Sequence, residues 1–82
     1  MELISTENRG CSGIYKITNL INGKVYVGRT RNLYARCSQY ISGFRNHDLN
    51  RVNEYLMKSV LKHGSDNFEF SIIEFCNIQE TD

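Results

Sequence analysis

The chain has 82 residues, of which 40% are hydrophobic and 23% charged, and its formal net charge is +1. This length allows one small domain with a single core, and the composition excludes disordered and collagen-like chains. No apolar run approaches the roughly 20 residues of a membrane-spanning helix, and the N-terminus lacks the pattern of a secretory signal. We therefore expect a cytoplasmic protein with no membrane partner.

The three cysteines, Cys11, Cys37 and Cys76, are widely spaced and form no CxxC pair. A zinc site needs closely paired ligands, whereas His47 and His63 lie next to no cysteine. An odd number of unpaired cysteines is typical of free thiols in a reducing compartment. The sequence therefore predicts an intracellular protein in which the thiols hold no metal.

The basic residues are concentrated in one part of the chain. Residues 9–45 hold no acidic residue and seven basic ones, namely Arg9, Lys16, Lys24, Arg29, Arg31, Arg36 and Arg45. Residues 63–82 hold five acidic residues instead, namely Asp66, Glu69, Glu74, Glu80 and Asp82. This asymmetry indicates a nucleic-acid-binding face; the alternative is a solvated surface on which the same charges are scattered.

The first half of the chain has the pattern of an arm followed by a β-hairpin. We expect residues 1–11 to form a flexible N-terminal arm. Residues 13–19 have the β-branched and aromatic composition of a strand. Asn22-Gly23 is a strong turn signal, because both residues tolerate a positive φ, and residues 24–29 then form the returning strand.

Two helices and a third strand follow. Thr30 or Asn32 can cap the first helix, and Gly43 and the polar run Asn46-His47-Asp48 are expected to end that helix. Its apolar stripe is Leu33, Cys37, Tyr40, Ile41 and Phe44. The second helix is expected from about Asn50 to His63, with a stop at Gly64. One face of this helix is formed by Val52, Leu56, Ser59 and Val60.

Residues 68–75 alternate well enough for a third strand. The element order is then strand, strand, helix, helix, strand. The economical architecture is an α+β fold in which a three-stranded antiparallel sheet packs against helices.

Strand parity brings two tyrosines to one face of this sheet. If the turn centres on Leu20-Ile21, Tyr15 and Tyr26 face each other directly; if it centres on Asn22-Gly23, they are offset on the same face. Gly28 on that face leaves open space beside Tyr26.

The first helix places an arginine beside a third phenol, because Arg36 and Tyr40 are i, i+4 neighbours. Arginine presents a fork of donors that matches phosphate. A tyrosine can activate water only with help from a nearby cation, since its reference pKa is about 10. The alternative is that Tyr15 and Tyr26 belong to the core and Arg36 to the surface.

The same residues carry a resemblance to a known family. Gly13-Ile14-Tyr15, Tyr26-Val27-Gly28 and Arg36 are followed by Asn53-Glu54-Tyr55-Leu56, Lys62-His63-Gly64 and the run 68–74. In this order and spacing, residues 13–76 resemble the GIY-YIG nuclease family. They are most similar to the N-terminal catalytic modules of phage homing endonucleases, which implies a metal-dependent DNA endonuclease in a phage-infected bacterial host.

The resemblance also implies roles for residues of this chain. Tyr15 is expected to be the general base or to orient the attacking water, with Tyr26 as its partner in the cleft. Arg36 is expected to clamp the phosphate, and Tyr40 to assist proton transfer. The implied structural residues are Gly13, Gly28 and Asn53. The basic residues expected to bind double-stranded DNA are Lys24, Arg29, Arg31 and Arg45.

One departure from the family concerns its divalent metal, Mg²⁺ or Mn²⁺. The family's metal-binding glutamate lies on a helix after the third strand, whereas this chain ends at Asp82, eight residues after Glu74. That ligand is therefore not present, and Glu80 is the weak substitute. We expect a nuclease domain over residues 12–82 that is truncated at its C-terminus and lacks this helix.

Without that helix, apolar surface around Phe68, Phe70 and Ile72 is expected to stay uncovered and to allow a homo-oligomer. The missing metal-binding glutamate also allows a second function. The chain can be a catalytically inactive module that binds DNA or a protein and interferes with a related nuclease.

Overall fold

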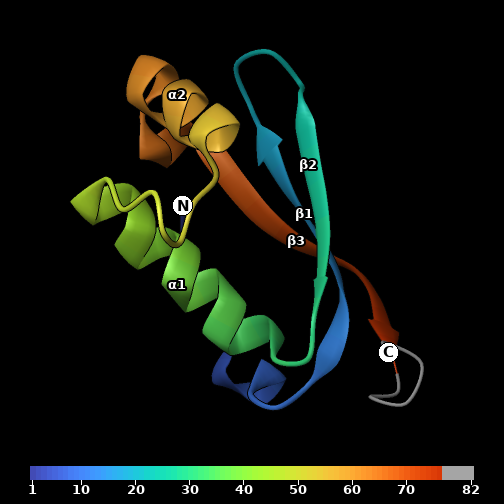
Figure 1. Cartoon of the computed structure of the whole chain (residues 1–82). Coiled ribbons are helices and arrows are strands. Elements are labelled where there is room, and N and C mark those ends of the chain that lie inside the picture. The colour runs from blue at the N-terminus through green and yellow to red at the C-terminus, as the bar shows by residue number, and fades with distance from the viewer. Residues whose placement is uncertain (77–82) are drawn as a thin grey trace.

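A three-stranded antiparallel sheet forms one layer of the molecule, and two helices form the other (Figure 1). The computed structural model describes residues 1–76. The strands are β1 (Ser12–Asn19), β2 (Val25–Thr30) and β3 (Phe68–Cys76), in the spatial order β2-β1-β3. The helices are α1 (Leu33–Asn46) and α2 (Glu54–His63), with 3₁₀ turns η1 (Thr6–Asn8) and η2 (Ser65–Asn67). This is the predicted α+β fold.

Both helices cover the same face of the sheet (Figure 1). The fully buried core between the two layers is contributed by β1, β3, both helices and Val52 of the linker between the helices. Its buried members are Tyr15, Ile17, Leu33, Cys37, Phe44, Val52, Leu56, Met57, Val60, Phe68 and Phe70. Within residues 1–76, neither helix is long or apolar enough to cross a membrane.

The hairpin turn differs from both alternatives that the sequence allowed. Gly13 pairs with Thr30 and Ile17 with Tyr26, so the turn centres between Ile21 and Asn22. The loop has this length because the backbone of Asn19 makes two hydrogen bonds with the far side of the loop. Its N–H donates to the carbonyl of Lys24, and its own carbonyl accepts the N–H of Gly23.

The first helix ends within the predicted polar run Asn46-His47-Asp48, whereas Gly43 lies inside α1 and does not end it. A Cβ at Gly43 would lie only 2.6 Å from Cγ2 of Val52, so the glycine lets the segment after the helix pack closely. The last residue of the helix is Asn46, and the next residue, His47, caps it in the left-handed conformation with φ 52°.

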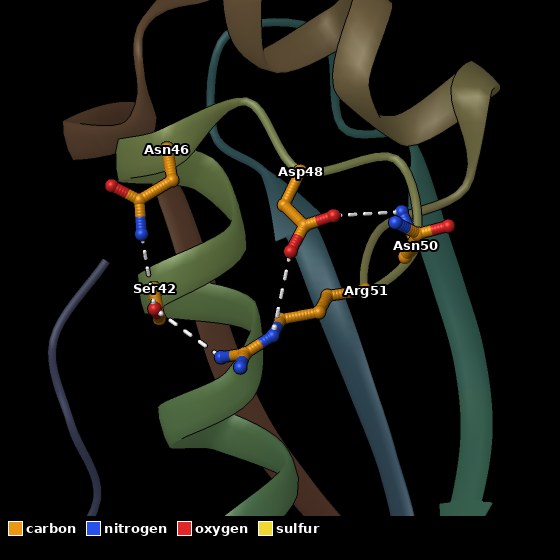
Figure 2. A network of polar contacts seen from close by, with 5 residues as sticks. All are labelled: Ser42, Asn46, Asp48, Asn50 and Arg51. Atoms are coloured by element: carbon orange, nitrogen blue, oxygen red, sulfur yellow. Dashed lines mark hydrogen bonds and ion pairs between the residues drawn. The ribbon is translucent and has the colours of Figure 1, made fainter.

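The second helix starts at Glu54 and not near Asn50, because the linker forms its own turn (Figure 2). The Asp48 carboxylate accepts the N–H of Asn50 at 2.9 Å and pairs with Nε of Arg51 at 3.5 Å. Asn53 then caps α2, since its side-chain oxygen accepts the N–H of Leu56 at 2.8 Å.

Residues 1–11, expected to form a loose arm, make contacts with the rest of the domain. The α-amino group of Met1 donates to the carbonyl of Ser65 at 2.7 Å. The side chains of this segment that pack against the core are Met1, Ile4 and Cys11. These contacts hold the segment, including η1, against the domain.

The expectation of an uncovered apolar surface around Phe68, Phe70 and Ile72 is wrong. Phe68 and Phe70 are only 2% and 7% exposed, and Ile72 packs against the core as well. The reason is strand parity, since alternate residues of β3 face the two helices. The exposed apolar side chains of the sheet are others, namely Val25, Val27, Ile73 and Phe75.

Candidate active site

Tyr15 lies at the centre of the site, in the middle strand of the sheet. Its ring stacks on Phe70 at 4.9 Å between centroids, and the residue is only 5% exposed. Across the hairpin it pairs with Gly28, where a Cβ would lie 2.5 Å from the Tyr15 hydroxyl. Gly28 thus leaves the space that the phenol of Tyr15 occupies, and not space beside Tyr26 as predicted.

The hydroxyl of Tyr15 is hydrogen-bonded to that of Tyr40 on α1, with 2.9 Å between the oxygens. Burial raises the pKa of Tyr15 far above its ordinary value of 10.0, and the hydrogen bond with Tyr40 raises it further. Arg36 acts in the opposite direction and lowers the pKa, but it does not offset the burial. Tyr15 therefore keeps its proton at neutral pH.

Tyr26 lies on the same face of the sheet, two positions from the residue that pairs with Tyr15. The expectation of two phenols on one face thus agrees with the structure, and the two are offset. The hydroxyl of Tyr26 is 2.9 Å from Oγ of Ser59 on α2. The sequence placed Ser59 on a face of this helix, but nothing in its spacing indicated a contact with Tyr26.

A hollow opens among residues at the end of β2 and the start of α1, two elements that follow each other in the chain (Figure 1). Its volume is about 380 Å³, and its lining residues are Arg29, Thr30, Arg31 and Arg36. Arg36 lies one helical turn before Tyr40, which is the predicted i, i+4 arrangement. Arginine has the donor geometry to bind a phosphate-like anion, and three of the residues that line this hollow are arginines.

Three other predicted site residues, Lys24, Arg45 and Gly13, do not line this hollow. Lys24 is exposed in the hairpin turn. Arg45, in the last turn of α1, lines a different hollow with Met1 and Ser65. Gly13 allows close strand packing, because a Cβ there would collide with the Glu74 carbonyl.

The hollow does not suit a metal cation, because three of its four lining residues are arginines. Within residues 1–76, no three His, Cys, Asp or Glu side chains gather closely enough to hold a metal ion. Glu80, the expected substitute ligand, lies outside the described residues. The side chains of residues 1–76 thus do not form a binding site for a divalent metal by themselves.

Comparison with known proteins identifies the domain. The family model of the GIY-YIG catalytic domain matches residues 11–81. This chain belongs to the GIY-YIG family. The matched range includes Tyr15 and Tyr26, which lie on the same face of the sheet, and Arg36 on α1.

Two solved structures of GIY-YIG proteins are similar to the chain. One is the catalytic domain of the intron endonuclease I-TevI, in a mutant with one glutamate replaced by alanine. It has 32% identity and a TM-score of 0.73 over 87% of this chain and 70% of that chain. The other is the catalytic domain of the homing endonuclease I-TevI. It has 31% identity and a TM-score of 0.74 over 85% of this chain and 73% of that chain.

The pKa of Tyr15 predicts how the stability of this GIY-YIG domain depends on pH. The unfolded chain loses this proton near pH 10.0, whereas the folded chain keeps it. Above pH 10.0 the chain must therefore take up a proton at Tyr15 when it folds. The contribution of Tyr15 to stability is fully present below pH 10.0 and is lost as the pH rises toward the pKa of the folded chain. We expect the free energy of unfolding to fall by up to about 1.4 kcal/mol per pH unit there.

Urea unfolding between pH 9 and 11, with Tyr15→Phe as the comparison, measures this slope. Burial also raises the pKa of the Cys37 thiol, which gives a slope of the same sign. Cys37 is present in both chains, so the difference between them isolates Tyr15. An equal slope in the Tyr15→Phe chain would contradict the assignment.

Proposed function

We propose that this chain is a DNA endonuclease domain that hydrolyses phosphodiester bonds of double-stranded DNA. The observation that carries the proposal is the Tyr15–Tyr40 hydroxyl pair. Arg36 lies one helical turn before Tyr40 on α1 and lines a hollow with two other arginines. Arginine binds phosphate through paired hydrogen bonds, and phenol hydroxyls can hold a water molecule. Membership of a nuclease family supports the same reaction class.

Each residue has a distinct role in this proposal. Arg36 binds the scissile phosphate and stabilises the charge that develops on it during attack. Tyr15 orients the attacking water, a role that suits a phenol whose pKa is raised further above neutral pH by burial. Tyr40, which is less buried, links Tyr15 to solvent and assists proton transfer. Tyr26 supplies the second phenol of the cleft.

The DNA backbone is proposed to enter through the arginine-lined hollow. Arg29 and Arg31 border that hollow with Arg36 and can contact phosphates flanking the scissile one. Lys24 and Arg45 lie away from the hollow. They can contact DNA only if the duplex extends beyond the hollow, so we propose them as secondary contacts.

We further propose that the domain serves homing in a phage-infected bacterial cell. The support is the similarity to catalytic domains of an intron and a homing endonuclease. Dependence on Mg²⁺ or Mn²⁺ is part of this proposal, and its carboxylate ligands would have to come from outside residues 1–76.

A nicking assay tests the proposed function. The chain is incubated with supercoiled plasmid in Mg²⁺, in Mn²⁺ or in EDTA. Nicked circles are expected with either metal and not with EDTA. Plasmid that stays supercoiled at concentrations where a mobility shift shows complete binding would contradict endonuclease activity.

The lack of a metal-ligand cluster in residues 1–76 favours a second candidate, an inactive module that binds DNA and interferes with a related nuclease. It predicts binding without nicking. If about four cations contact phosphates, the logarithm of the binding constant falls with the logarithm of salt concentration with a slope of about −3.6. A flat salt dependence would contradict DNA binding by either candidate.

A further inference from the structure

Ser59 is the hydrogen-bonding partner of the second site tyrosine. Its Oγ lies 2.9 Å from the hydroxyl of Tyr26, and both residues are half-buried. Within residues 1–76, it is the one side chain hydrogen-bonded to that phenol. Its neighbour Val60 and the preceding-turn residue Leu56 are buried in the core, so Ser59 places a hydroxyl at the border of the apolar face of α2.

The two helices hold the two site tyrosines in the same way. Tyr15 extends from the sheet to Tyr40 on α1, and Tyr26 extends from the sheet to Ser59 on α2, with 2.9 Å between the oxygens in each case. We propose that Ser59 is a positioning residue of the nuclease site, which fixes the hydroxyl of Tyr26. This inference rests on the proposed function.

Tyr26 needs such a partner because of where it lies. It belongs to β2, an edge strand with a neighbour on one side only. The adjacent Val25 and Val27 are exposed on the other face. Tyr26 therefore has less packing around it than Tyr15, which is stacked on Phe70.

The chemistry of two hydroxyls explains what positioning would achieve. A serine hydroxyl has one proton to donate and two lone pairs. When Ser59 donates to the phenol oxygen, the proton of Tyr26 is free to be donated to water or to a phosphate oxygen. Loss of the serine hydroxyl leaves the phenol without this fixed direction, while the ring itself stays in place.

The test is a double-mutant cycle between Ser59→Ala and Tyr26→Phe in the nicking assay. Ser59→Ala is expected to lower kcat about fivefold, the effect of one neutral hydrogen bond, and to leave KM within about twofold. In the Tyr26→Phe chain, the same substitution is expected to change nothing further. Ser59→Thr, which keeps a hydroxyl, is expected to restore most of the rate.

A second readout does not depend on activity. With ¹³C-labelled tyrosine rings, Ser59→Ala is expected to shift the Cζ resonance of Tyr26 and to leave that of Tyr15 unchanged. An unshifted Tyr26 resonance would overturn the proposal, whatever the nicking rates are. So would a fivefold loss that persists in the Tyr26→Phe chain, because Ser59 would then act through another group.

The same data separate this inference from the proposed function. If the parent chain does not nick DNA, the proposed function fails and the catalytic part of the inference fails with it. If the parent chain nicks DNA and Ser59→Ala nicks at the parent rate, the proposed function stands and only the inference about Ser59 is overturned.

Discussion

Arg36→Ala is expected to lower the single-turnover rate of plasmid nicking by about a thousandfold. Arg36 lines the arginine-rich hollow, and in the proposed reaction its guanidinium stabilises the charge that develops on the phosphate in the transition state. Removing one preorganised donor of this kind costs about a hundredfold to a thousandfold, and removing an arginine that acts on a phosphoryl group costs about a thousandfold or more. The loss corresponds to about 4 kcal/mol of transition-state stabilisation.

Two further variants make this prediction specific. Lys62→Ala removes one positive charge from an exposed position on α2 and is expected to nick at the parent rate. Arg36→Lys keeps the charge but loses the planar fork, so we expect an intermediate rate. An Arg36→Ala chain that nicks like the Lys62→Ala chain would rule out a role for Arg36 in the reaction.

Gly28→Ala is expected to lower both the stability of the domain and its activity. The added Cβ would lie 2.5 Å from the Tyr15 hydroxyl and 2.6 Å from Cζ of the same ring. The ring cannot move away easily, because it is stacked on Phe70 and hydrogen-bonded to Tyr40. Overpacking of this kind costs about 2 kcal/mol of unfolding free energy, and a displaced site residue costs about a hundredfold in rate.

Urea unfolding and the nicking assay measure the two effects. The matched control is Val27→Ala, which changes the neighbouring residue of β2 on the exposed face of the sheet. Val27 is 66% exposed, so its replacement is expected to stay within about 0.5 kcal/mol of the parent. A Gly28→Ala chain as stable as the Val27→Ala chain would contradict the close packing of Tyr15 on Gly28.

Local patterns predicted the fold, the position of Tyr15 and Tyr26 on one face of the sheet, and the i, i+4 arrangement of Arg36 and Tyr40 on α1. Alternation in the strands and the i, i+4 spacing in the helix depend only on residues close together in the chain, so both can be read from the sequence alone. The register of the hairpin was not predictable in the same way. It depends on the hydrogen bonds that Asn19 makes across the loop, and the turn signal allowed more than one loop length.

Contacts between distant elements could not be predicted. Val52, nine residues after Gly43, packs so closely against this glycine of α1 that a Cβ there would lie 2.6 Å from Cγ2 of Val52. The contact between Tyr26 and Ser59 joins residues 33 positions apart. Phe68 and Phe70 are buried because both helices cover the same face of the sheet, which the element order alone does not determine.

The most direct test of the central claim is to locate DNA on the chain with its own tyrosines. A chain with ¹³C-labelled tyrosine rings is titrated with a short DNA duplex without added metal, so that no cleavage occurs. The ring resonances of Tyr26 and Tyr40 are expected to shift, and that of Tyr55, which is 84% exposed on α2, is expected to stay unchanged. A shift of Tyr55 alone would place the DNA outside this cleft and would contradict the account.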